Sequence, residues 1–139
     1  MDTNGQNTSR SPDAALQNTQ LSYNEFLTQN PASGNLKIQA SRGEGAIPTS
    51  NVRIMVLQNF DTGRVVFFDG TTDADGIIPR ISLPAPPRAS SYNSKDPQRG
   101  AVYQVYASHP SFRSQSYEIE IFDSITSILP IALSLPREG

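Results

Sequence analysis

The sequence predicts an all-β fold, a seven-stranded sandwich preceded by an N-terminal extended arm. Between residues 35 and 135, apolar residues alternate with polar ones at a period of two, which is typical of half-buried strands. Turn-forming Gly, Pro and Asp separate these stretches at a spacing of about 12 residues, as in sandwich domains. No part of this range has the pattern of a helix of ordinary length. These observations together favour two packed sheets.

The first 33 residues differ in composition from the rest of the 139-residue chain. They are rich in Asn, Gln, Ser and Thr, and they offer too little apolar surface to offset the entropy of ordering them. We therefore expect a polar arm over residues 1–33 and a β-sandwich domain over residues 34–139. The large apolar side chains of the arm are candidate anchors for self-assembly, namely Leu16, Leu21, Tyr23, Phe26 and Leu27.

A short helix is expected near residues 22–29 of the arm. Ser22 followed by Glu25 fits a capping box, in which each side chain accepts a hydrogen bond from the other residue's backbone N–H. Tyr23, Phe26 and Leu27 then fall on one helical face. Such a short helix is marginal by itself, and the Asn-Pro-Ala-Ser-Gly run at residues 30–34 ends it.

Seven strands are expected along the domain. Turns rich in Gly, Pro or Asp at residues 43–48, 61–63 and 73–76 separate the first four, and a Pro-rich loop over residues 84–100, of undetermined role, precedes the last three. The third is apolar on both faces, whereas the sixth alternates most clearly. The apolar residues that mark the strands are, in order, Leu36, Ile38 and Ala40; Val52, Ile54 and Val56; Val65–Phe68; Ile77, Ile78, Ile81 and Leu83; Tyr103, Val105 and Ala107; Tyr117, Ile119 and Ile121; and Ile131, Leu133 and Leu135.

Composition and charge disfavour several classes of partner. The formal net charge is −2 without a basic stripe, so we expect no nucleic acid partner. No apolar run reaches the length of a bilayer span and no cationic amphipathic stretch is present, so we expect no membrane partner. There are no cysteines. The first residues lack the features of a secretory signal, so we expect any route out of the cell, such as lysis, to use no classical signal peptide.

The residues that most resemble a chemical site are better explained by structure. The single histidine, His109, precedes a proline and reads as a strand-end turn. Asp73 and Asp75 lack the remainder of a calcium-binding loop, and a hairpin turn explains them, although ion binding there stays open. Glu118 and Glu120 alternate with apolar residues and so point to solvent. We therefore expect no catalytic residues, no cofactor, no metal site and no enzymatic activity.

Several segments together resemble carboxypeptidase-regulatory-like (transthyretin-like) domains, in particular a clostridial branch associated with spore and cell-wall proteins. The resemblance covers about residues 34–135, and the arm lies outside it. It implies a seven-stranded Greek-key sandwich of the prealbumin or immunoglobulin type, used for display, spacing or binding. The segments are Gly34–Ala40, Ala46–Pro48, Val52–Ile54, the Thr-Asp-x-x-Gly hairpin Thr72–Ile77, Leu83–Arg88, Tyr103–Ala107 and His109–Phe112.

Two functions from different classes fit these observations. The first is a structural protein that self-assembles with other copies of itself, through the arm, into a fibre or array on the surface of a bacterial spore or cell envelope. An extended segment can add to a sheet edge or fill a groove on the next copy. The second is a binding or adaptor module for peptidoglycan, another glycan or a cell-wall hydrolase partner. Its stacking platforms would come from Tyr92, Tyr103, Tyr106 and Tyr117, although the strand pattern favours core positions for Tyr103 and Tyr117. In either case, cell-wall or spore-coat components are further candidate partners.

Overall fold

The computed structural model describes residues 21–88 and 100–136. These residues form one helix and eight strands, and the prediction of an all-β sandwich is confirmed at that level. Leu16 and Tyr92 lie outside the described residues. The elements in chain order are α2 (Tyr23–Gln29), β2 (Ala32–Arg42), β3 (Ile47–Pro48), β4 (Arg53–Phe60), β5 (Gly63–Thr71), β6 (Ile77–Ala85), β7 (Ala101–His109), β8 (Phe112–Ile121) and β9 (Thr126–Ala132).

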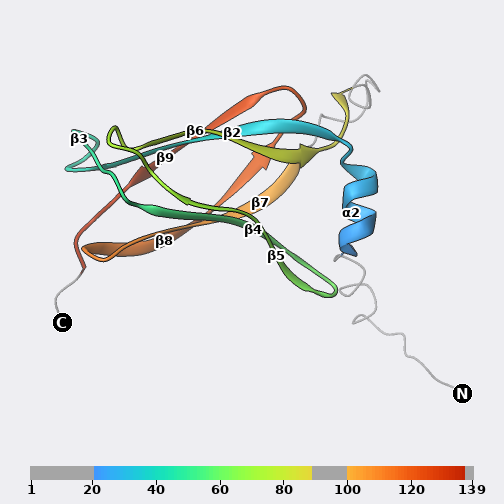
Figure 1. Cartoon of the computed structure of the whole chain (residues 1–139), viewed down its shortest axis with the longest axis horizontal. Coiled ribbons are helices and arrows are strands. Elements are labelled where there is room, and N and C mark those ends of the chain that lie inside the picture. Colours follow the sequence, from blue (N-terminus) through green and yellow to red (C-terminus); the bar gives the residue numbers. More distant parts are fainter. Residues whose placement is uncertain (1–20, 89–99, 137–139) are drawn as a thin grey trace, which may run out of the picture.

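Two sheets pack face to face (Figure 1). In the first, β2 is central and pairs antiparallel with β6 and the two-residue β3, and parallel with β9. The second has the antiparallel order β5-β4-β7-β8. Strand β3 was not predicted, because the turn after β2 returns for only two residue pairs.

The core lies between the sheets, where alternate residues of each strand point inward. Leu36 and Ile38 of β2 are fully buried, as are Ile54 of β4 and Val105 of β7. Burying a side chain of this size contributes about 1.5–3 kcal/mol relative to leaving it exposed. The burial of these alternating apolar side chains is therefore the main source of the stability of the sandwich.

The apolar run on β5 has a local cause. The pairing of β4 with β5 shifts register between Val56 and Leu57, which face Phe68 and Val66 respectively. This β-bulge leaves Phe67 without a direct partner and changes the direction of its neighbours. Phe67 and Phe68 are both half-buried and pack against the core. Consecutive apolar residues of β5 thus contact the same core, and the outer face of the strand needs no further layer to cover it.

The last strand lies earlier in the sequence than predicted. β9 ends at Ala132 because its partner, β2, ends at Arg42. One further backbone hydrogen bond, 2.8 Å from Leu133 N to Ser41 O, ties the chain down after the strand. Leu133 is buried, but Leu135 is 71% exposed. The apolar alternation therefore continues past the strand onto the surface.

The turn between β5 and β6 connects the two sheets, so the hairpin predicted for Thr72–Ile77 is wrong: β5 pairs with β4 and β6 pairs with β2. A buried polar contact holds this turn. The Thr72 hydroxyl donates to the Thr49 carbonyl at 2.8 Å and accepts from the Val52 N–H at 3.1 Å. Gly76 has a φ of 76°, and a Cβ there would lie 2.3 Å from the Ala40 carbonyl oxygen. Only glycine fits this left-handed position against β2, so the turn fixes the two sheets relative to each other.

Candidate docking site

Helix α2 packs into one end of the sandwich instead of standing apart from it. Its capping box is formed, with Glu25 N donating to Ser22 Oγ at 3.0 Å and Ser22 N to Glu25 Oε1 at 3.1 Å. Phe26 is 4% exposed. Its ring makes edge-on contacts with Phe60 at 5.2 Å and Tyr103 at 6.0 Å between centroids. The helix is therefore part of the folded domain of its own chain.

The five residues expected to serve as assembly anchors fall into three groups. Leu16 lies outside the described residues. Phe26 is committed to the core of its own chain, and the Leu21 carbonyl accepts a hydrogen bond from Asp61 N at 3.2 Å. Tyr23 and Leu27 remain 36% and 38% exposed. The burial of Phe26 and the hydrogen bond to Leu21 thus hold the first described residues at the α2 end of the domain.

An apolar groove lies near β3 and the residues that follow β9. Strand β3 and helix α2 are at opposite ends of the molecule (Figure 1). We call this groove the C-terminal groove; its volume is about 530 Å³. The sequence analysis missed it because its walls come from three distant parts of the chain. The only sequence signal was the apolar alternation beyond β9. The groove is lined by Arg42, Gly43, Glu44, Ile47, Phe112, Leu133, Ser134 and Leu135.

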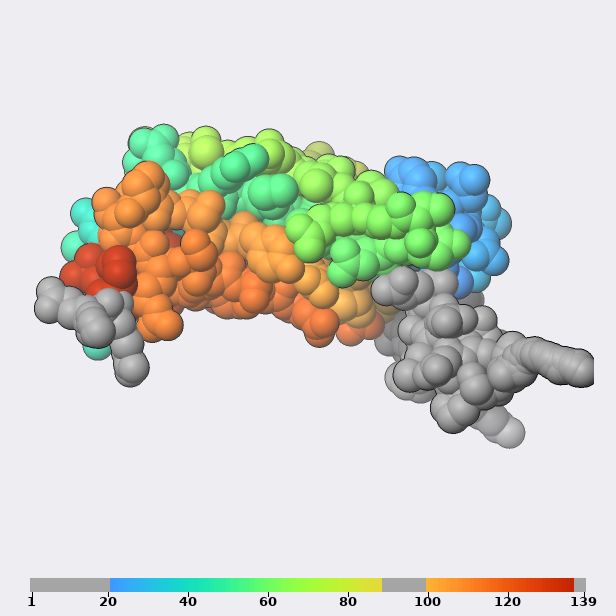
Figure 2. Space-filling view, turned by 90° about the horizontal axis from the view of Figure 1, so that it is seen from below, coloured from blue at the N-terminus to red at the C-terminus, as the bar shows by residue number. Residues whose placement is uncertain are grey.

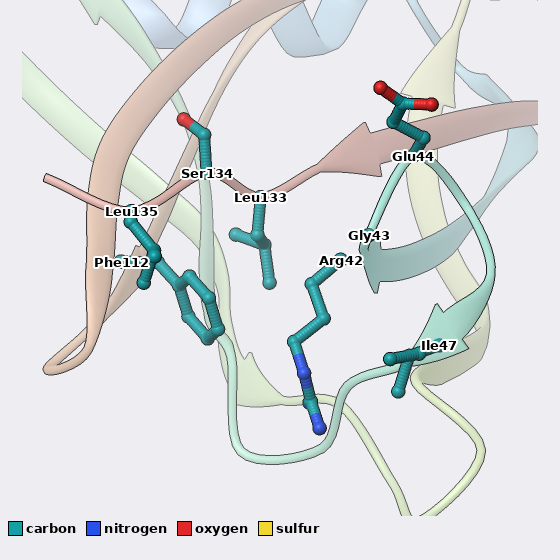
Figure 3. Close-up of a pocket in the computed structure, with 8 residues that line it drawn as sticks. All are labelled: Arg42, Gly43, Glu44, Ile47, Phe112, Leu133, Ser134 and Leu135. Carbon is teal, nitrogen blue, oxygen red and sulfur yellow. The ribbon is translucent and has the colours of Figure 1, made fainter.

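The Arg42 side chain crosses the C-terminal groove. Figure 3 shows its aliphatic stem between Ile47 on one side and Phe112 with Leu133 on the other, while Glu44 points away. Arg42 is half-buried, and its Nη1 donates to Thr49 Oγ1 at 3.3 Å. Among residues 21–88 and 100–136, no carboxylate forms an ion pair with it. The groove therefore combines apolar walls with a cation that has unused hydrogen-bond donors.

One wall of the C-terminal groove is a left-handed turn. Gly43, Glu44 and Gly45 have φ values of 63°, 57° and 90°, and Ala46 N closes the turn by donating to Gly43 O at 3.1 Å. A non-glycine residue such as Glu44 adopts this conformation at a cost. The turn directs Ile47 back over the groove, next to Gly43.

The outer face of the β5-β4-β7-β8 sheet carries a half-buried tyrosine, Tyr106. Tyr106 borders a shallow hollow of about 340 Å³ with Ser108, Ser114 and Ser116. The Arg64 guanidinium carbon lies 6.0 Å from the Tyr106 ring centroid. By contrast, Tyr103 is buried, its hydroxyl donates to Pro84 O at 2.5 Å, and burial raises its pKa. Of the four tyrosines proposed as platforms, Tyr103 is therefore a core residue.

An exposed ion pair links β4 to β5. Arg53 Nε and Nη2 donate to the two Asp69 carboxylate oxygens at 3.0 and 2.7 Å. These hydrogen bonds lower the pKa of Asp69 and raise that of Arg53. The arrangement is a bidentate surface pair.

The other candidate residues occupy structural positions. His109 Nδ1 accepts from Ser111 N at 3.0 Å in the β7–β8 turn. Asp73 Oδ1 accepts from Asp75 N and Ile77 N, both at 2.9 Å, which closes the β5–β6 turn. Glu120 Oε2 accepts from Gly100 N at 2.7 Å. Each of these three side chains thus has a backbone partner.

The described residues also bear on metal binding and on membrane spanning. In the part of the chain that the structure describes, no three His, Cys, Asp or Glu side chains gather as a metal site would require. The helix found within those same ranges is too short and too polar to cross a bilayer.

Comparison with known proteins identifies the fold alone. No family model matches the chain, and no curated protein matches it either. The Bacillus anthracis TIE protein matches at 16% identity and a TM-score of 0.51, over 75% of this chain and 17% of that one. The minor pilin of Streptococcus agalactiae matches at 16% identity and 0.52, over 78% of this chain and 47% of that one. This chain therefore spans less than half the length of either protein.

A transthyretin-like architecture is also found among the matches. Transthyretin from Sparus aurata matches at 16% identity and a TM-score of 0.40, over 70% of this chain and 89% of that one. That score is too low to carry an argument. The matches include enzymes as well, and because a fold does not determine function, these likenesses do not decide catalysis.

Proposed function

We propose that this chain is a non-catalytic structural protein that assembles with copies of itself, through the residues that precede α2, into a fibre or array on a bacterial spore or cell envelope. The resemblance to the clostridial branch of carboxypeptidase-regulatory-like domains supplies the location. The minor pilin among the matching folds is consistent with a surface role, and we extend its kind of role to this chain as part of the proposal.

The anchoring of α2 is the observation that carries this proposal. Because Phe26 is locked among aromatic rings, residues 1–20 are attached to a fixed base at one end of an elongated molecule (Figure 2). A contact that this segment makes with a second copy would be heterologous, and repetition of such a contact builds an open fibre. The twenty residues can extend over at most about 70 Å, which is ample for this purpose.

Negative-stain electron microscopy of the purified protein tests the proposal, with a variant lacking residues 1–20 beside it. A longer deletion to residue 33 is unsuitable, since it would remove Phe26 from the core and Ala32 and Ser33 from β2. We expect fibres from the full chain and monomers from the truncated one, with circular dichroism showing that both are folded. Monomers in both samples would contradict the proposal, as would fibres that persist without residues 1–20.

The Tyr106 hollow favours a second candidate, a binding module for cell-wall material. A partly exposed aromatic ring beside serine hydroxyls is suited to stack on a sugar and hydrogen-bond its hydroxyls. This candidate predicts that the monomer co-sediments with purified peptidoglycan and that Tyr106→Ala reduces the bound fraction. Val102→Ala, at an exposed position on the same strand, is the matched control and should bind as the unmodified chain does. Equal binding by both variants would remove this candidate.

A further inference from the structure

The chemistry of the C-terminal groove defines what can occupy it. Its walls offer Phe112, Leu133 and Leu135 to an apolar side chain, and Leu135 gains most from being covered because it is 71% exposed. The half-buried Arg42 guanidinium has one hydrogen-bond partner among the described residues, Thr49. An occupant therefore needs one apolar anchor and one nearby carboxylate.

The chain itself contains a segment with this combination. Asp13-Ala14-Ala15-Leu16 places a carboxylate three residues before a leucine, and the residues between them are small. In a polyproline II conformation, which has three residues per turn, these two side chains project from the same side and lie about 9 Å apart along the axis. Leu16 is also the single large aliphatic side chain among residues 2–20, so it is the available apolar anchor of that stretch.

The position of the groove points to a second copy. The described chain begins at the α2 end, whereas the C-terminal groove lies at the other end, beside β3 (Figure 1). We infer that residues 13–16 of one copy bind the C-terminal groove of the next, with Leu16 against Phe112 and Leu135 and Asp13 facing Arg42. This inference rests on the proposed function and names the contact that builds the fibre.

Substitution of the groove rim tests the contact without disturbing the core. Leu135→Asp places a charge on an exposed rim position and should raise the critical concentration for fibres by about tenfold or more. Ile128→Asp is the matched control, because Ile128 is also an exposed aliphatic residue, at 54%, but lies outside the groove. It should leave the critical concentration unchanged, and circular dichroism should show both variants folded.

Crosslinking tests the pairing of residues directly, since the chain has no cysteines. Full-length protein with Leu16→Cys is mixed with a differently tagged full-length protein with Leu135→Cys and oxidised. We expect a covalent heterodimer of the two tags, and much less product when Ile128→Cys replaces Leu135→Cys. A charge exchange adds a second readout: Arg42→Glu and Asp13→Arg should each weaken assembly, and the double variant should restore it.

The outcomes separate this inference from the proposed function. Fibres that need residues 1–20 but survive Leu135→Asp would overturn the groove contact while the assembly proposal stands. A chain carrying both cysteines that crosslinks only within itself would also overturn the contact, because the segment would then fold back on its own copy. The absence of fibres under all conditions would refute both.

Discussion

The packing of α2 can be tested by removing the Phe26 ring. Phe26 is 4% exposed and lies edge-on to Phe60 at 5.2 Å, Phe67 at 5.9 Å and Tyr103 at 6.0 Å. Truncating a buried phenylalanine to alanine costs about 3–5 kcal/mol, which includes the cavity left behind. Each aromatic pair contributes about 0.5–1.5 kcal/mol of this beyond its buried area. We therefore expect Phe26→Ala to lower the free energy of unfolding by about 3–5 kcal/mol.

Urea unfolding followed by circular dichroism measures this loss. With a slope of about 2 kcal/mol per molar urea, the midpoint should fall by about 1.5–2.5 M. Leu27→Ala, on the same helix but 38% exposed, is the control and should lose less than about 1 kcal/mol. If Phe26→Ala unfolds within about 1 kcal/mol of the unmodified chain, with an unchanged slope, then α2 does not pack on the sandwich and the fixed base proposed for residues 1–20 is refuted.

Three further predictions concern the turns and loops. Gly76→Ala should lose about 2 kcal/mol or more of stability in urea, because it places a Cβ at a positive φ against the Ala40 carbonyl; unchanged stability would mean that the turn can move. Thr72→Val keeps the shape but leaves the Val52 N–H and Thr49 carbonyl unpaired, at about 1–3 kcal/mol each, and Thr72→Ser should recover most of that loss. The pKa of Asp123 is lowered by hydrogen bonds from the backbone N–H of Arg88 and from the Ser124 hydroxyl. The Asp123 carboxylate therefore stabilises the folded state fully above the usual carboxyl pKa of about 3.9, and this stabilisation is lost as the pH falls through the lower pKa of the folded protein. Asp123→Asn should therefore flatten the fall in melting temperature between about pH 5 and 2, and an unaltered pH profile would count against this assignment.

Local patterns were sufficient to predict most of the strands and the capped helix. Leu36 and Ile38 alternate with polar neighbours, and both are fully buried in β2. Ser22 and Glu25 form the capping box that their spacing indicates. These features depend on residues that are only a few positions apart, so the sequence alone is enough to predict them.

Features that depend on distant residues could not be predicted in the same way. The partners of Phe26 come from β4, β5 and β7, so its amphipathic position indicated burial but not where. The bulge opposite Phe67 follows from the β4–β5 register. The C-terminal groove joins the turn after β2, the start of β8 and the chain after β9, and no pattern within any one of them indicates a concave surface.

The parallel pairing of β2 and β9 has a mechanical consequence. Seven residues of β2, Asn35–Ser41, face seven of β9, Thr126–Ala132, and these are the first long strand and the last strand of the described chain. Tension applied between the α2 end and the C-terminal end would pull the two strands in opposite directions along their common axis. Their hydrogen bonds would then bear the load together in shear, instead of opening one after another like a zipper. Forced unfolding depends on the rate of crossing that barrier, so this sandwich is built to resist stretching along its long axis.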